Sequence, residues 1–357
     1  MSDNRNANFI IGKDDLILVT GAAGFIGKKV VQNLLRRGYR NLRCLARSSN
    51  SLCRIDQTVE PFRKSARVEV VKGNLLSRKD CLALTRGVEV VYHLAAARGE
   101  KSFPEAFMNS VVTTRNLIES ALQEDLLKRF VNVSSFAVYA NTHKRNTRLL
   151  DESCPIEAHP ELRGSAYDFA KAKQEELVNH YAKHFGLPSV IVRPGYVFGP
   201  GNEAITGRVG ISPFGVFLHL GGPNRIPFTY IDNCADAIAL AGLVEGIEGE
   251  IFNVVDDDLP TSRGFLHQYK KNVRRFASLY IPHAISYIFC LGWESYSAWS
   301  HGQLPPVYNR KLWHASWKKT NYSNKKIKAR LGWSPVVPMR DALVRYFRSC
   351  AERLEHA

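Results

Sequence analysis

Short apolar runs alternate with segments of helical periodicity through the first half of the chain. The run at 16–20 (LILVT) precedes the glycine-rich GAAGFIG at 21–27, and the following KKVVQNLLRRG has the apolar spacing of a helix that ends at Gly38. Fully apolar strands separated by helices are typical of a parallel sheet covered on both faces. The sequence therefore predicts an α/β fold with a doubly wound parallel sheet. Further strands are expected at 41–47, 67–73, 88–97, 129–135 and 189–194, and further helices at 110–123 and 165–186.

The glycines at 21–27 suit a turn that binds phosphate. Gly21, Gly24 and Gly27 stand between the first strand and the first helix, at the carboxyl edge of the sheet where ligands bind. Gly21 can adopt turn dihedral angles, Gly24 lets a pyrophosphate approach the backbone, and Gly27 allows close packing of helix on strand. The helix that follows points its N-terminus at the phosphates. The pattern predicts dinucleotide binding.

The end of the second strand bears on which dinucleotide is bound. NAD enzymes usually carry an acidic residue there, which binds the ribose hydroxyls. Here the strand ends in CLARSSN, with Arg47 and no carboxylate. An arginine can bind a 2′-phosphate, so NADP is favoured. Arg47 could instead stack on the adenine of either cofactor, which leaves NAD open.

Ser135, Tyr167 and Lys171 form a candidate catalytic set. Tyr167 and Lys171 are four residues apart and share one face of the predicted helix, while Ser134 and Ser135 end the fifth strand at the ligand edge. A phenol is a poor base at neutral pH unless a nearby cation stabilises the phenolate. Lys171 supplies that cation, and Ser135 can hold a substrate oxygen while Tyr167 transfers a proton. The alternative is that Ser135 caps a strand end and Tyr167 packs in the core.

Composition and charge narrow the class of protein. The 357 residues are 45% hydrophobic and 23% charged, as in an ordinary globular protein. The formal net charge is +16, with basic residues throughout the chain and one concentration at 311–330. No nucleic-acid-binding motif accompanies this charge, so we expect no nucleic acid partner. An anionic cofactor or a membrane surface fits the charge better.

The spacing of the cysteines and the length of the apolar runs indicate where in the cell the protein is found. The seven cysteines include no CxxC pair and no His-paired spacing, so we expect reduced thiols and no metal site. The N-terminus lacks the apolar core of a signal peptide, and the apolar run at 279–293 is too short to span a bilayer. We expect a cytoplasmic protein that can associate with a membrane surface.

Seven motifs together resemble the extended short-chain dehydrogenase/reductases, the NAD(P)-dependent epimerase/dehydratase superfamily, and their pattern is nearest to its hydroxysteroid and sterol dehydrogenase branch. They are TGAAGFIG (20–27), YHLAAA (92–97), VNVSSFAVYA (131–140), YDFAK (167–171), VRPGYVFGPG (192–201), FTYIDNCADAI (228–238) and ARLGWSP (329–335). The resemblance implies a Rossmann domain at 12–195, to which 225–256 returns, and a substrate domain formed by 196–224 and 257–350. It also implies a homodimer.

The same resemblance assigns residues to the site. The catalytic residues it implies are Ser135, Tyr167 and Lys171. One position departs from the pattern, because Asn74 replaces an aspartate that contacts adenine; an amide can still donate a hydrogen bond there. The cofactor-binding residues implied are Gly21, Gly24, Phe25, Ile26, Gly27, Arg47, Asn74, Leu75, Ala95, Ala96, Ala97, Tyr167, Lys171, Pro194 and Val197.

Departures from the family patterns separate the substrate classes. Dehydratases of the superfamily have Asp-Glu after the catalytic hydroxyl, where this chain has Phe136 and Ala137. Sugar-nucleotide epimerases usually have an Asn where Tyr196 stands and an Arg where Ile226 stands. Arg225 is one position off, although Arg208 could take its place at a diphosphate. These departures argue against dehydration and weaken the case for a sugar nucleotide.

The segment 280–317 favours another substrate. It is rich in Trp and Tyr and resembles the corresponding region of the hydroxysteroid and sterol dehydrogenases. We therefore expect an oxidoreductase that transfers hydride between a nicotinamide and a lipophilic secondary alcohol or ketone, with the segment lining the pocket or resting on a membrane. Three alternatives stay open: the aromatic residues form the core of the small domain, the protein is a sugar-nucleotide epimerase, or it is a non-catalytic NADP sensor.

Overall fold

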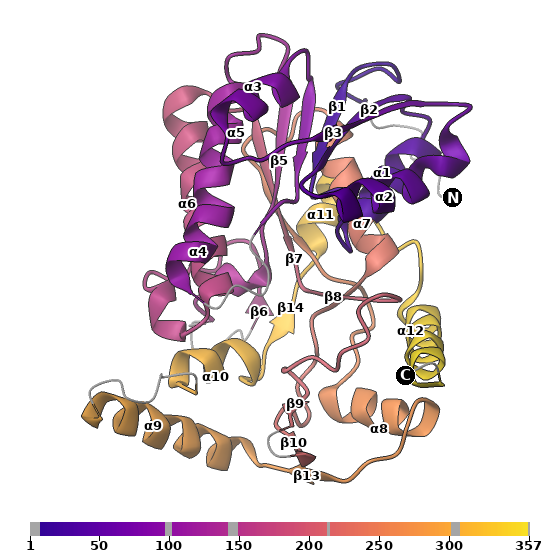
Figure 1. The fold of residues 1–357 in the computed structure, drawn as a ribbon. Coiled ribbons are helices and arrows are strands. Elements are labelled where there is room, and N and C mark those ends of the chain that lie inside the picture. Colours follow the sequence, from indigo (N-terminus) through magenta and orange to yellow (C-terminus); the bar gives the residue numbers. More distant parts are fainter. Residues whose placement is uncertain (1–7, 97–101, 142–148, 213–214, 301–307, 356–357) are drawn as a thin grey trace.

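The computed structural model describes residues 8–96, 102–141, 149–212, 215–300 and 308–355. A parallel seven-stranded sheet stands at its centre, in the order β12-β7-β5-β4-β1-β2-β3 (Figure 1). The order reverses between β1 and β4, so a crevice opens there at the carboxyl ends of the strands. This is the predicted doubly wound, Rossmann-type sheet. Its strands are β1 (Ile17–Thr20), β2 (Asn41–Ala46), β3 (Arg67–Lys72), β4 (Val90–His93), β5 (Arg129–Val133), β7 (Ser189–Pro194) and β12 (Ile251–Val254).

Helices cover both faces of the sheet (Figure 1). The apolar sides of α1, α2, α7 and α11 form one core with the strands, and those of α3, α5 and α6 form a second core on the opposite face. Burial of apolar side chains from both faces explains why the strands read as unbroken apolar runs. These helices are α1 (Gly27–Arg36), α2 (Ser49–Val59), α7 (Ile231–Leu243), α11 (Lys325–Leu331), α3 (Arg78–Thr85), α5 (Thr113–Ala121) and α6 (Ala166–Phe185).

Two predicted elements differ from the structure by more than two residues at one end. The expected strand at 88–97 is only β4, because the chain leaves the sheet after His93 to form a wall of the crevice. The expected helix at 110–123 begins inside a π-helical turn (Met108–Val112), which is preceded by α4 (Phe103–Phe107) and continues as α5. Such turns inside helices are frequent at functional sites.

The rest of the chain packs below the carboxyl edge of the sheet (Figure 1). A third core joins α8 and α12 to β8 and β11. The remaining elements are β6 (Leu149–Leu150), β8 (Tyr196–Phe198), β9 (Gly210–Ile211), β10 (Phe217–His219), β11 (Phe228–Tyr230), β13 (Ser278–Tyr280), β14 (Asn321–Tyr322), α8 (Ser262–Asn272), α9 (His283–Trp299), α10 (Arg310–Ser316) and α12 (Met339–Glu355), with 3-10 turns at Glu60–Phe62, Phe136–Val138 and Pro160–Arg163.

The chain returns to the main sheet after it has begun the lower part. Helix α7 packs on α1, and β12 pairs with β7 to complete one edge of the sheet. Both elements lie within 225–256, the segment that the sequence assigned to the Rossmann domain. The domain division itself stays a prediction.

The seven cysteines are free thiols. Cys44, Cys81, Cys234, Cys290 and Cys350 are buried, and burial raises the pKa of each. Cys154 is half-buried, and Cys53 is exposed on α2. Cys53 is therefore the one exposed cysteine of the seven.

No helix within the described ranges combines the length and the apolar character that crossing a membrane requires.

Candidate active site

A cleft of about 850 Å³ lies at the carboxyl ends of the central strands. It contains every predicted catalytic and cofactor-binding residue except Ala97, which lies outside the described residues. The predicted residues that line it are Gly21, Gly24, Phe25, Ile26, Gly27, Arg47, Asn74, Leu75, Ala95, Ala96, Ser135, Tyr167, Lys171, Pro194 and Val197.

The glycine turn forms the floor of this cleft. Gly21 has φ +68°, and a Cβ there would lie 2.9 Å from the backbone nitrogen of Ala95. A Cβ on Gly27 would lie 2.1 Å from the carbonyl oxygen of Gly21. Neither position accepts a side chain, so the turn keeps its backbone open where α1 begins. A compact backbone turn at a helix N-terminus fits a pyrophosphate.

Two guanidinium groups stand where β2 ends. Arg47 is exposed in the cleft, and Arg54, on α2, lines the same wall together with Ser51. Serine hydroxyls and guanidinium groups are the donors that a phosphate monoester needs. Asn74 lines the cleft too, but its side chain accepts a hydrogen bond from the backbone N–H of Leu76 (3.0 Å), so its carbonyl oxygen is partly used within its own loop.

Tyr167 and Lys171 occupy the start of α6 in contrasting environments. Ser165 caps the helix by accepting a hydrogen bond from the N–H of Asp168, which fixes the first turn. Tyr167 is 37% exposed, whereas Lys171 is 5% exposed. Burial lowers the pKa of Lys171 to about 8, although the nearby Glu175 carboxylate opposes the shift. The ammonium of Lys171 therefore titrates close to neutral pH.

Hydrogen bonds to neighbouring elements hold the ammonium of Lys171 in place. It donates hydrogen bonds to the carbonyl oxygen of Val133 (2.7 Å) and to Oε1 of Gln174 (2.9 Å). Gln174 in turn donates to Oγ1 of Thr114 on α5 (2.8 Å). These contacts come from β5, α5 and α6, so the position of the lysine depends on three packed elements.

A buried histidine extends this chain of hydrogen bonds to the glycine turn. The hydroxyl of Thr114 donates to the Ser110 carbonyl (2.5 Å), so it accepts a hydrogen bond from Nε2 of His93 (2.8 Å). Nδ1 of His93 then accepts from the hydroxyl of Thr20 (2.8 Å). Burial lowers the pKa of His93 to about 3, so the ring is neutral at physiological pH. The result is a polar connection between β1 and Lys171.

Ser134 and Ser135 have different partners. Ser134 donates to Glu175 Oε2 (2.5 Å), and Glu175 also binds the buried Arg193, whose Nε lies 3.1 Å from Oε1. Burial alone would lower the pKa of Arg193, but Glu175 outweighs it and raises that pKa. Ser135 lines the cleft, and its Oγ accepts a hydrogen bond from the N–H of Ala137 (3.2 Å). Within the part of the chain that the structure describes, no acceptor takes the hydroxyl proton of Ser135, which can serve a ligand.

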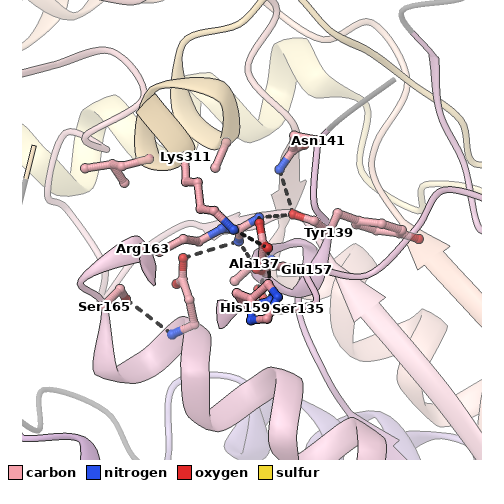
Figure 2. Close-up of polar contacts among 12 residues, drawn as sticks. Ser135, Ala137, Tyr139, Asn141, Glu157, His159, Arg163, Ser165 and Lys311 are labelled. Carbon is pink, nitrogen blue, oxygen red and sulfur yellow. Dashed lines mark hydrogen bonds and ion pairs between the residues drawn. The ribbon is translucent and has the colours of Figure 1, made fainter. Parts of the chain in front are cut away.

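Figure 2 shows a second buried cation close to this serine. The guanidinium of Arg163 donates to the carbonyl oxygens of Ala137 and Tyr139, in the turn that follows Ser135. It lies 3.5 Å from the carboxylate of Asp168, the residue after Tyr167. Arg163 therefore holds the serine turn and the first turn of α6 at a fixed separation.

The same cluster reaches the lower part of the molecule. Glu157 lies 3.8 Å from Arg163 and accepts a hydrogen bond from Lys311 on α10 (2.7 Å) (Figure 2). Asn309, the N-cap of α10, donates to the carbonyl oxygen of Arg163 (3.2 Å). Contacts through Glu157 and Arg163 thus connect α10 to the turn that carries Ser135.

Sequence reasoning missed several of these residues. Arg54 was missed. It stands seven residues after Arg47, on the helix that follows β2, and lines the same wall of the cleft as Arg47. Thr114 and Gln174 carry a weaker signal, as polar residues on the inward faces of α5 and α6. No group of three or more His, Cys, Asp or Glu side chains suited to a metal ion lies within the described ranges.

The described residues of the aromatic segment 280–317 do not line the cleft. Among the described residues, the walls of the cleft contain no member of this segment. Trp313 and Trp317 pack in a small core with Leu220 and Cys290, while Trp299 faces solvent. The expectation that this segment lines a substrate pocket is therefore not shown by its described residues and stays a prediction. Its side chains fill the space between α9, α10 and β10, or they point outward.

Comparisons with known proteins place these features in a family. A family model described as "NAD dependent epimerase/dehydratase family" matches residues 17–254. A trifunctional UDP-glucose 4,6-dehydratase/UDP-4-keto-6-deoxy-D-glucose 3,5-epimerase/UDP-4-keto-L-rhamnose-reductase of Arabidopsis thaliana is 29% identical over 252 residues. That match covers 67% of this chain and 36% of the relative, so the chain spans little more than a third of that protein's length.

Two further comparisons cover more of the chain. A 3beta-hydroxysteroid-dehydrogenase/decarboxylase of Arabidopsis thaliana is 25% identical over 354 residues, which is 92% of this chain and 78% of the relative. The crystal structure of UDP-glucuronic acid 4-epimerase from Bacillus cereus, in complex with UDP-glucuronic acid and NAD, has a TM-score of 0.70 at 22% identity. It covers 95% of this chain and 99% of that one.

The sheet order and the cleft at its switch point define a Rossmann-type α/β protein. The chain belongs to the NAD dependent epimerase/dehydratase family, since the family model matches well over half of it. This confirms the family resemblance that the sequence motifs indicated.

Proposed function

We propose that this protein is an NAD(P)-dependent oxidoreductase that interconverts a secondary alcohol and a ketone. The observation that carries the proposal is the pairing of an accessible Tyr167 with a buried Lys171 one turn further along α6, both facing the cleft beside Ser135. A sensor that only bound the cofactor would not need this pair. The non-catalytic alternative is therefore disfavoured.

The proposed chemistry assigns one task to each side chain. Tyr167 accepts the hydroxyl proton of the alcohol, or returns it to the ketone oxygen in the reverse direction. The ammonium of Lys171 stabilises the phenolate and so brings the phenol into a useful pKa range. Ser135 donates a hydrogen bond to the substrate oxygen. A nicotinamide cofactor held by the glycine turn and Lys171 would supply the hydride-transfer chemistry.

The cofactor we propose is NADP, with NAD as the alternative. The glycine turn suits the pyrophosphate that both share, and Arg47 with Arg54 suits the 2′-phosphate that only NADP carries. The UDP-glucuronic acid 4-epimerase structure contains NAD. The two arginines are the reason to expect a different preference here.

A lipophilic substrate remains the first candidate but has lost one support, because none of the described residues of the aromatic segment lines the cleft. The sugar-nucleotide alternative is supported by two similar proteins whose names include UDP-sugars. Arg208 is the residue of this chain that could serve a diphosphate; its Nη1 donates to the carbonyl oxygen of Ala315 (2.7 Å), which ties it to α10. An epimerase would use the same Tyr167 and Lys171 chemistry.

One series of measurements tests the proposal. Thermal shifts with NADP, NAD and UDP-sugars identify the ligands, and turnover is then compared between wild type and Tyr167→Phe. We expect the variant to lose about 10²–10⁴-fold in rate while its cofactor Kd stays nearly unchanged, because only the transferable proton is removed.

Tyr181→Phe is the matched control, since Tyr181 lies on the same helix and donates to Glu119 (2.8 Å), away from the cleft. A Tyr167→Phe enzyme that kept more than a tenth of the wild-type rate would refute the proton-transfer role. Saturable UDP-sugar binding with interconversion of two sugar epimers would select the second candidate.

A further inference from the structure

The fully buried side chains of helix α9 are small, whereas most of its large apolar side chains are exposed. Ser286, Cys290 and Ser297 are the buried residues of the helix. The side chains of Ile288 and Trp299 are 65% and 75% exposed. An ordinary surface helix shows the reverse arrangement, with the apolar stripe facing the core. The other large apolar side chains that α9 exposes are Ile285, Phe289, Leu291 and Tyr296.

Specific contacts fix this orientation. Trp313 of α10 donates its indole N–H to Oγ of Ser286 (2.9 Å). One turn later Cys290 packs between Leu220 and Trp317, and the carboxylate of Glu294 pairs with Arg310 (2.9 Å). The inward side of α9 is therefore occupied along its length, and rotation of the helix would break these contacts.

The exposed apolar surface extends beyond the helix. Leu279 and Tyr280 of β13 are exposed directly before α9, and Val216 is exposed directly before β10, with which β13 pairs. Within the described residues, eight of the 21 large hydrophobic side chains that are exposed lie in 279–299. Scattered single residues need no explanation, but a contiguous patch marks an interaction site.

The same part of the chain carries most of the net charge. Residues 259–340 contain 14 Lys or Arg and one acidic residue, Glu294, and so account for +13 of the formal +16. The positions of the basic residues alone do not reveal this excess of positive charge, because they are spread along the whole chain. The excess arises because residues 259–340 contain almost no acidic residues. The basic run 311–330 is largely engaged in ion pairs, such as Lys311 with Glu157 and Lys328 with Asp257.

A second basic group stands beside the apolar surface. Lys270, at the end of α8, donates to Oγ of Ser278 in β13 (2.6 Å) and lies over the ring of Phe276. Lys271, Arg274 and Arg275 follow in the connection to β13, and all three are exposed. Figure 1 shows α8, β13 and α9 along the lower end of the molecule, away from the main sheet.

We propose that α9 and β13 form a membrane-docking surface that rests in the interface of an anionic phospholipid bilayer. The exposed apolar side chains enter the boundary between headgroups and acyl chains, where Trp and Tyr are favoured. The basic residues at 270–275 lie at its edge and attract the anionic headgroups. The helix lies on the surface and does not cross it.

Charge decides between a bilayer and a second copy of the chain. A symmetric dimer through this face would bring the same patch of each copy together, and with it two sets of basic residues. Like charges at such a contact oppose association. An anionic lipid surface supplies the opposite charge and an apolar layer together. The proposal does not depend on the reaction catalysed in the cleft.

The full chain is tested by flotation with two kinds of vesicle, phosphatidylcholine alone and phosphatidylcholine mixed with phosphatidylglycerol. We expect binding to the anionic vesicles, weakened by salt. Ile288→Ser with Trp299→Ser should reduce bound protein about tenfold or more, and so should Lys271→Glu with Arg275→Glu. Melting temperature, oligomeric state and turnover of a water-soluble substrate should not change.

Matched controls come from the opposite part of the molecule. Phe185→Ser removes a side chain that is 58% exposed at the end of α6, and Arg78→Glu with Lys79→Glu reverses two exposed charges on α3. Both should bind vesicles as the wild type does. If the α9 double variant fails to fold, Ile285→Ser alone makes the same comparison.

Three results would overturn the proposal. One is a wild-type protein that stays with the soluble fraction on anionic vesicles. Another is an α9 variant that binds as well as the controls. The third is a wild-type dimer that the α9 variant converts to monomer without any change in vesicle binding, which would identify a second copy as the occupant.

Discussion

Tyr167 and Lys171 are neighbours on α6, yet water reaches one of them and barely reaches the other. Their spacing could be read from the sequence because positions i and i+4 of a helix always share a face. Their environments could not, because the burial of Lys171 depends on the packing of α6 against Val133 of β5 and Thr114 of α5, as well as on Gln174 of its own helix. The pair was predictable, but the depressed pKa of the lysine was not.

That pKa predicts a pH dependence. Lys171 titrates at about 8 in the folded protein and near 10.5 when unfolded. Below pH 8 the ammonium supports Tyr167, so ketone reduction should slow as the pH rises through about 8. The kcat/KM profile of Lys171→Arg should lose this limb, because a guanidinium stays charged. An unchanged limb in that variant would assign it to another group.

The stability of the folded protein should increase as the pH rises above 8, whereas the rate of ketone reduction should fall. Between pH 8 and 10.5 the unfolded chain binds more protons at Lys171 than the folded one, so the free energy of unfolding rises with pH in this window. The contribution is on the order of 3 kcal/mol. From pH 8 to pH 10.5 the unfolding free energy of the wild type should therefore rise relative to that of Lys171→Met, which has no group that titrates at this position. Urea denaturation at each pH measures both values.

Arg47 and Arg54 should set the cofactor preference. Arg47→Asp would repel a 2′-phosphate and could accept ribose hydroxyls, so affinity should shift from NADP towards NAD. Arg54→Gln should weaken NADP by roughly tenfold, the cost of one charge-assisted hydrogen bond, and leave NAD unaffected. Fluorescence titrations give both constants. Arg67→Asp, at the far end of β3, is the control; NADP affinity equal in all four proteins would exclude the two arginines from the site.

At the scale of elements, the glycine turn and the apolar strands were predictable because each follows from a local pattern. Gly21 needs its positive φ, and the strands need apolar side chains on both faces. The role of 280–317 was not predictable in this way. Its aromatic content was compatible with a pocket, a core or an exposed surface, and the structure divides it between the last two: α10 and Trp317 face inward, whereas α9 turns its apolar side outward.

This division predicts two different outcomes for tryptophan substitutions. Trp317 is 3% exposed and donates its indole N–H to the carbonyl oxygen of Gly207 (2.9 Å), so Trp317→Ala should cost about 3–5 kcal/mol of unfolding free energy. Trp299→Ala should change it by less than about 0.5 kcal/mol. Chemical denaturation measures both values. Equal losses would mean that α9 is packed on both sides.

At the scale of the whole molecule, the chain leaves the main sheet after β7 and returns to it only for the last strand of that sheet, β12. β12 is added to the edge next to β7 only after the chain has passed through β8 to β11 and α7. The motif pattern indicated this return at 225–256, whereas periodicity could not, because strand pairing between distant segments leaves no local trace. The concentration of charge in 259–340 was equally invisible to a count of basic residues alone.

Because β12 lies beyond residue 195 in the chain, we predict that the first 195 residues do not fold alone. A fragment 1–195 lacks both β12 and the helix α7 that buries the apolar sides of α1, β5 and β7. We expect such a fragment to aggregate or to give no cooperative melting transition, whereas residues 8–355 should melt in one. Circular dichroism during heating distinguishes the two. A fragment with a sharp transition would show that the edge strand is dispensable.

The single accessible thiol has a practical consequence. Cys53 is exposed on α2, next to Arg54 in the wall of the cleft, whereas the other six cysteines are buried or half-buried. A maleimide dye should therefore label the native protein at one place without any engineered cysteine. Because that place adjoins the arginines proposed for the 2′-phosphate, the emission of the dye would report cofactor arrival, and bound cofactor would slow the labelling.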